Sequence, residues 1–156
     1  LQGSQICFNE VQENIEIEVH YREGLFSVGD IYEENGQPIG IVFNVFNLGK
    51  SANVVSIESL TFDQKYNWET AKSEAAKHQG WMIPNIDEFS KIYENMNTIK
   101  NILQSQGKTI STEERVWSST EYNAEYAYMF NLFEGYAMGI DKTVDGKILL
   151  VKTISK

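Results

Sequence analysis

Several residue types that mark particular classes of protein are scarce in this chain of 156 residues. The single cysteine, Cys7, excludes an intrachain disulfide, and it lies in a polar stretch without an activating base. The two histidines, His20 and His78, fall on different predicted elements, so no zinc framework is present. There is no glycine-rich phosphate loop and no serine in a nucleophile elbow. The sequence therefore predicts no catalytic residues, no metal site, no cofactor and no enzymatic activity.

Positive charge and long apolar runs are also missing. Thirteen Lys and Arg residues against 22 Asp and Glu residues give a formal net charge of −9. Nucleic acids and anionic membrane surfaces attract basic faces, so neither is an expected partner. No run reaches membrane-spanning length. The loop from Asp141 to Asp145 lacks the dense oxygen spacing of a calcium loop, so we expect folding to need no calcium.

Aromatic residues are abundant, with eight Phe, eight Tyr and three Trp. An apolar content of 42% and this length predict one globular domain over residues 1–156, with 1–14 as a polar lead-in. No signal peptide is visible and the chain begins with Leu, so we expect a signal, an anchor or another domain upstream.

The first half of the chain favours strands. Apolar and polar residues alternate strictly from Ile15 to Tyr21, as in a half-buried strand. Asn35-Gly36 predicts a two-residue hairpin turn between strands at Val28–Glu33 and Pro38–Phe46. The run from Ile39 to Phe43 is almost entirely apolar, which indicates a strand covered on both faces. A further strand is expected at Ala52–Ile57.

The middle of the chain changes to a helical period. Asn67 can cap a helix over Trp68–Gln79 that closes at Gly80. Pro84 cannot continue a helix and favours extended geometry at the residue before it. A second helix should follow at Ile86–Asn95, where Asn85 and Glu88 fit a capping box. A shorter third helix should carry Ile99 to Leu103 and end at Gly107, before a polar loop over Lys108–Arg115.

Strands return in the last quarter of the sequence. They are expected at Val116–Ser119, Tyr126–Phe133, Tyr136–Val144 and Ile148–Ile154, with Asp145-Gly146 as a tight hairpin between the last two. The last strand should lie beside the first. The order of strands, helices and strands predicts an α+β fold with a mostly antiparallel twisted sheet and two to three helices between N- and C-terminal strands.

Five motifs in the same order resemble the bacterial DUF1566 family, which has a C-type lectin-like fold and is similar to the C-terminal domain of a Legionella collagen-like adhesin. The resemblance runs from about 28 to 154. The first motif joins Gly29 to Tyr32 with the strand from Gly40 to Phe43. The other four are the helix with Trp68 and Ala71, the corner from Gly80 to Glu88, the segment Trp117-Ser118-Ser119-Thr120-Glu121, and the strand from Ala127 to Leu132. Its structural residues in this chain are Trp68, Gly80, Trp81, Pro84, Glu88, Trp117, Ser118, Ser119, Glu121, Asn131 and Gly135.

The resemblance implies a non-catalytic, extracytoplasmic recognition or adhesion module of a bacterial surface or secreted protein, in the periplasm, on the outer membrane or released. Its ligand is an unidentified glycan or protein. We expect a monomer or part of a larger surface protein. Two alternatives stay open: a structural subunit of a surface or fimbrial assembly, and an enzyme related to formylglycine-generating proteins, whose cysteine pair this chain lacks.

A candidate ligand site lies in the loop between the strands after Trp117. We expect Glu121, Tyr122, Asn123, Glu125 and Tyr126 to be exposed there, because loops on a rigid scaffold commonly carry function. Tyrosine offers a large contact area at low entropy cost, and asparagine offers adaptable hydrogen bonds. The alternative is that Tyr122 and Tyr126 only cover the underlying sheet.

Overall fold

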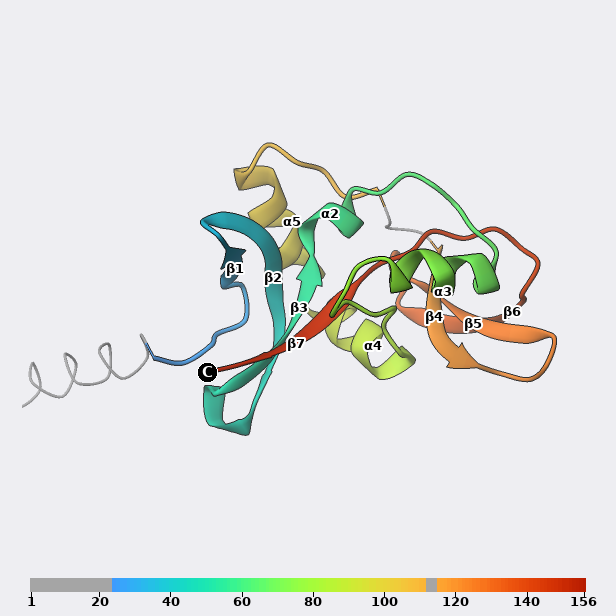
Figure 1. Cartoon of the computed structure of the whole chain (residues 1–156), viewed down its shortest axis with the longest axis horizontal. Helices are drawn as coiled ribbons and strands as arrows, with labels where there is room; N and C mark the ends of the chain where they lie inside the picture. Colours follow the sequence, from blue (N-terminus) through green and yellow to red (C-terminus); the bar gives the residue numbers. More distant parts are fainter. Residues whose placement is uncertain (1–23, 112–114) are drawn as a thin grey trace, which may run out of the picture.

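A computed structural model describes residues 24–111 and 115–156 (Figure 1). The described chain is a mixed α+β protein whose strands pair antiparallel in two sheets. Its elements are β1 (Ile31–Glu34), β2 (Gln37–Phe46), the 3-10 turn η1 (Asn47–Gly49), β3 (Ser51–Ser56), α2 (Ile57–Leu60), α3 (Trp68–Ala76), α4 (Ile86–Glu94), α5 (Met96–Ser105), β4 (Arg115–Glu121), β5 (Tyr126–Asn131), β6 (Tyr136–Asp141) and β7 (Val151–Ser155). The predicted α+β class and antiparallel pairing are confirmed, but the strands of the described residues form two sheets where a single one was expected. The predicted number of two to three helices was wrong as well, because the one-turn helix α2 brings the α-helices of these residues to four.

The larger sheet has the order β1-β2-β3-β7. Asn35 and Gly36 both have positive φ, 53° and 76°, which confirms the predicted hairpin turn between β1 and β2. β2 is buried on both faces, as its apolar run predicts: Ile41 and Phe43 enter the main core, while Val42 packs on the opposite face. β2 and β3 are thus the central strands that hold this half of the molecule together.

The smaller sheet has the order β4-β5-β6. The predicted hairpin at Asp145-Gly146 was wrong, because β6 pairs with β5 whereas β7 crosses to the other sheet and pairs with β3. The crossing segment 142–150 is held by other bonds. Gly146 forms an antiparallel bridge with Tyr66, and the Trp117 N–H donates to the Lys147 carbonyl at 2.9 Å. Figure 1 shows this segment running from β6 in the smaller sheet to β7 in the larger sheet. The strand that was predicted at Ile148–Ile154 begins only at Val151.

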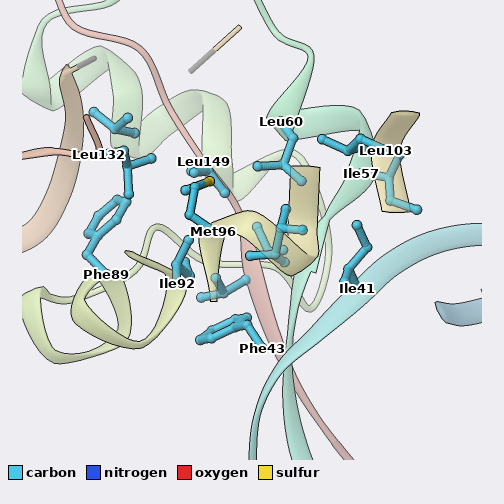
Figure 2. Close-up of a cluster of buried hydrophobic side chains, with 14 of the residues drawn as sticks. Ile41, Phe43, Ile57, Leu60, Phe89, Ile92, Met96, Leu103, Leu132 and Leu149 are labelled. Carbon is cyan, nitrogen blue, oxygen red and sulfur yellow. The ribbon is translucent and has the colours of Figure 1, made fainter. Parts of the chain in front are cut away.

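The main core fills the space between the helices and both sheets. Figure 2 shows Phe89, Ile92 and Met96 beside Leu132 and Leu149, with Phe43 close by. The Phe89 and Phe130 rings stack at 5.3 Å between centroids, which fixes α4 on one face of β5. Phe89, Ile92 and Met96, which recur at helical spacing, are buried in this core, whereas Tyr93 on the same stripe is exposed.

The helix ends follow their capping residues. Asn67 accepts a hydrogen bond from the Thr70 N–H, so α3 begins where the sequence predicted. α3 ends at Ala76 rather than at Gln79, and Gly80, with φ of 86°, lies in the turn that follows. Asn85 and Glu88 form the predicted capping box of α4, with bonds of 2.8 and 3.0 Å.

The tryptophan motifs build a second core beneath the smaller sheet. Trp68 is 3% exposed and Trp117 has no exposed surface, whereas Trp81 is only half-buried. The Trp68 Nε1 donates to the Ser118 carbonyl at 2.9 Å, and the Ser118 hydroxyl donates to the Tyr128 carbonyl at 2.6 Å. These bonds connect α3, β4 and β5.

Two further motif contacts join the corner after α3 to β4 and close the turn after β5. The Ser119 N–H donates to the Pro84 carbonyl at 2.9 Å, which holds the chain before α4 against β4. Asn131 accepts the N–H groups of Phe133 and Glu134, and Gly135 follows with φ of 84°. These contacts give Pro84, Ser119, Asn131 and Gly135 positions in the packing of the corner and the turn.

Three sequence predictions fall outside the described residues: the strand at Ile15–Tyr21, and the surroundings of Cys7 and His20. The pairing of that first strand with the last one falls there too. Of the predicted loop Lys108–Arg115, residues 112–114 lie outside the description, and Arg115 is the first residue of β4.

Candidate functional site

The hairpin that joins β4 to β5 carries all five predicted site residues, and all five are exposed. The turn is held by Asn123, whose side-chain oxygen accepts the N–H groups of Glu125 and Tyr126 at 2.9 and 2.8 Å. The N–H of Tyr122 donates to the Tyr126 carbonyl at 2.9 Å. Asn123 therefore shapes the hairpin, because its side-chain oxygen is already used within the turn.

Strand alternation divides the predicted residues between two faces of the sheet. Tyr126 and Tyr128 are two residues apart on β5, so both lie on the same face. The Tyr122 ring meets the Tyr128 ring edge-on, with centroids 5.5 Å apart. Tyr122 is 61% exposed and Tyr126 is 38% exposed, whereas Tyr128 is half-buried.

The neighbouring strand β6 completes this surface. Its register places Gly139 opposite Tyr128 and Asp141 opposite Tyr126. A Cβ atom added at Gly139 would meet nothing within 4 Å, so the sheet is open beside the Tyr128 ring. We call the surface formed by Tyr122, Tyr126, Tyr128, Gly139 and Asp141 the tyrosine face.

Helix α4 limits the tyrosine face on one side. It covers the same side of the sheet at Phe130, and its first N–H, that of Ile86, approaches the Thr120 hydroxyl at 3.4 Å. Beyond this point the β4–β5 hairpin extends away from the helices, to the end of the molecule farthest from β1 (Figure 1). The tyrosines are therefore an open patch at one end of the molecule.

Glu121 lies on the opposite face of the sheet and has a different role. It pairs with Ala127, which is buried in the second core, and its carboxylate lies 3.4 Å from the Lys142 ammonium. Lys142 also donates to the Ala124 carbonyl at 3.0 Å and lies 4.5 Å from the centre of the Trp68 ring. Glu121 and Lys142 thus hold the hairpin against the body of the domain.

Asp141 brings a negative charge to the rim of the tyrosine face. Its Oδ1 accepts the backbone N–H of Thr143 at 2.9 Å and the Thr143 hydroxyl at 2.7 Å. These two hydrogen bonds, the backbone one being the stronger cause, lower the pKa of the Asp141 carboxyl below its ordinary value. The group is therefore ionised at neutral pH.

Sequence reasoning missed Tyr128, Gly139 and Asp141, because they lie on strands rather than in the loop. Alternation within Tyr126–Asn131 does place Tyr128 beside Tyr126. The partners on β6 depend on register, which the sequence does not state directly.

A hollow of about 620 Å³ lies at the end of the smaller sheet that is opposite to the β4–β5 hairpin. It is lined by Lys65, Arg115, Asn131, Phe133, Asp145, Gly146 and Lys147. Arg115, the last residue of the predicted polar loop, forms part of its wall.

Within residues 24–111 and 115–156, no group of three or more His, Cys, Asp or Glu side chains is arranged to hold a metal ion. None of the helices described is long and apolar enough to cross a membrane.

The chain was compared with known families, curated proteins and solved structures. No family model matches the chain, and no curated protein matches it. The fold is similar to part of the adhesin InvE of Yersinia pseudotuberculosis, with a TM-score of 0.40 and 15% sequence identity. That match covers 84% of this chain and 34% of the adhesin, so the chain spans about a third of that protein's length.

Proposed function

We propose that this chain is a non-catalytic, extracytoplasmic recognition or adhesion module of a bacterial surface or secreted protein, and that its ligand binds the tyrosine face. The ordered motifs support assigning it to the DUF1566 family and to the C-type lectin-like fold. They include Trp117 to Glu121 and the capping corner from Gly80 to Glu88, whose residues make structural contacts.

The observation that carries the proposal is the open cluster of tyrosines at the end of the smaller sheet. Monomeric proteins usually cover large aromatic side chains, and exposed groups of them commonly mark recognition surfaces. Tyr122 is 61% exposed, so most of its side chain is free to contact a ligand, and Gly139 leaves space beside Tyr128. Protein or sugar groups can stack on such a surface.

The hairpin is held in place before any ligand binds. Asn123 closes the turn, and Lys142 ties it to Trp68 and Glu121. A surface that is already ordered loses less conformational entropy on binding, so a small contact area can suffice. This rigidity supports a recognition role for the hairpin.

The test is a screen of the intact chain on a glycan array and a protein array, followed by a Tyr122→Ala/Tyr126→Ala variant. We expect this variant to lose at least about tenfold in affinity for any ligand found, because truncating central aromatic contacts typically costs 2 kcal/mol or more. Stability should change by less than about 1 kcal/mol, as for other surface substitutions.

The matched control is Phe133→Ala/Tyr136→Ala, which removes two aromatic rings of similar exposure, 69% and 44%, at the other end of the sheet. It should leave affinity unchanged. Unchanged binding in a folded Tyr122→Ala/Tyr126→Ala variant, with loss in the control, would move the site to the hollow around Phe133 and contradict the proposal.

A further inference from the structure

We propose that the partner of the tyrosine face is a basic peptide segment whose arginine or lysine side chains lie over the tyrosine rings. This inference rests on the proposed function and adds the chemical class of the ligand. The faces of tyrosine rings carry negative charge density, and cations within about 6 Å of a ring centre are attracted to them.

The charges of the described residues around the face are one-sided. β5 has no charged side chain, β6 has only Asp141, and the hairpin tip has only Glu125. The first turn of α4, which approaches Thr120, adds Asp87 and Glu88. Exposed rings surrounded by carboxylates complement a cationic partner.

The positive groups near this surface are already engaged. Lys142 is directed to the opposite face of the sheet, where it contacts Glu121 and the Trp68 ring. Lys91 in α4 lies 3.7 Å from the Glu94 carboxylate. Among the described residues, neither lysine forms an ion pair with Asp141 or Glu125.

Elsewhere in this protein, an aromatic ring and a nearby carboxylate together hold a lysine side chain. Lys72 lies 3.7 Å from the centre of the Trp68 ring and 3.2 Å from the Glu69 carboxylate. Lys142 lies over the same ring and beside Glu121. On the tyrosine face, rings and a carboxylate are present, and no Lys or Arg of residues 24–111 and 115–156 is found over these rings. The open space at Gly139 leaves room for a cation beside Tyr128.

The experiment measures binding of a fluorescein-labelled octapeptide of alternating Arg and Gly by fluorescence anisotropy, with a Gln and Gly octapeptide as the neutral probe. We expect the intact chain to bind the Arg peptide and not the Gln peptide. Binding should weaken steeply between about 50 mM and about 500 mM salt, where exposed charges become screened.

A pair of charge variants separates a specific site from general attraction by an acidic chain. Two double variants each raise the net charge by two. Asp141→Asn/Glu125→Gln does so at the rim of the tyrosine face and the adjoining hairpin tip, and Asp145→Asn/Glu134→Gln does so at the far end of the sheet. Asn at 141 keeps a side-chain oxygen for the Thr143 bonds. The first variant should bind the Arg peptide at least about fivefold more weakly, and the second within about twofold of the natural chain.

A second measurement needs no variant. Adding the Arg peptide to the ¹⁵N-labelled natural chain should shift the amide signals of Tyr126, Tyr128, Gly139 and Asp141, and leave those around Phe133 unchanged. Equal weakening in both charge variants, shifts spread over the whole acidic surface, or absence of binding at low salt would each overturn the inference. If the arrays yield a neutral, salt-insensitive glycan whose binding depends on Tyr122 and Tyr126, the proposed function stands and the basic partner is excluded.

Discussion

Trp117 illustrates how much one side chain contributes to this domain. Its indole has no exposed surface, and its Nε1 donates to the Tyr66 carbonyl at 2.8 Å. Gly146 packs against the same ring, since a Cβ there would lie 3.1 Å from the indole. Trp117 therefore joins β4 to the loop before α3 and to the segment that crosses between the sheets.

We expect Trp117→Ala to lower the free energy of unfolding by about 3–5 kcal/mol, because it removes a fully buried indole and leaves a cavity. Trp117→Phe keeps most of the volume and loses the hydrogen bond to Tyr66, which typically contributes about 1 kcal/mol. Urea denaturation measures both. A loss below about 1 kcal/mol for Trp117→Ala would mean that the indole is not a core residue.

At the scale of elements, the turn between β5 and β6 depends on a close contact with α4. Gly135 has φ of 84°, and a Cβ atom there would lie 2.5 Å from the Tyr93 ring. Tyr93 also contacts Phe130, with ring centroids 6.4 Å apart. The glycine thus lets the turn approach the helix that borders the tyrosine face.

We expect Gly135→Ala to destabilise the domain by about 2–3 kcal/mol, from both left-handed backbone strain and the clash with Tyr93. Gly36→Ala is the matched control, since Gly36 has φ of 76° and open space around it. Its cost should be the backbone strain alone, about 1 kcal/mol. Thermal melting of both variants in the natural and Tyr93→Ala backgrounds measures the clash. Equal costs of the two substitutions would contradict a steric role for Tyr93.

At the scale of the whole molecule, sequence reasoning performed best where the signal is local. Asn35-Gly36, Asn67 and the Asn85–Glu88 pair each determine a turn or cap through bonds within a few residues, and all three were predicted. The destination of the chain after Gly146 was not predictable this way. A turn-forming dipeptide does not reveal that β7 pairs with β3, about 100 residues earlier in the chain.

The candidate site follows the same division. The exposure of the hairpin was expected from its polar residues, and the structure agrees for all five positions. Side chains alternate between the two faces of the sheet, and Glu121 lies on the face opposite to Tyr122 and Tyr126. That separation depends on which face of the sheet is buried. The pairing register between β4 and β5 also shifts between Trp117 and Glu121, so counting alternate residues from Trp117 does not give the face of Glu121.

We also expect the whole domain to fold without calcium. Two acidic residues near turns already accept local hydrogen bonds: Asp30 accepts the Ser27 N–H, and Asp141 accepts the Thr143 N–H and hydroxyl. A chelator should leave the melting temperature unchanged. A drop of several degrees that added calcium reverses would contradict this and would indicate a bound ion that stabilises the folded state.

The course of β7 determines how the domain would bear a mechanical load. The Lys156 N–H donates to the Lys50 carbonyl, so the end of β7 lies beside the turn between β2 and β3. The hairpin tip with Tyr122 lies at the opposite end of the long axis (Figure 1). A pulling force between a ligand held there and the C-terminus would run along β7. It would load the hydrogen bonds between β7 and β3 together, in shear, rather than open them one after another.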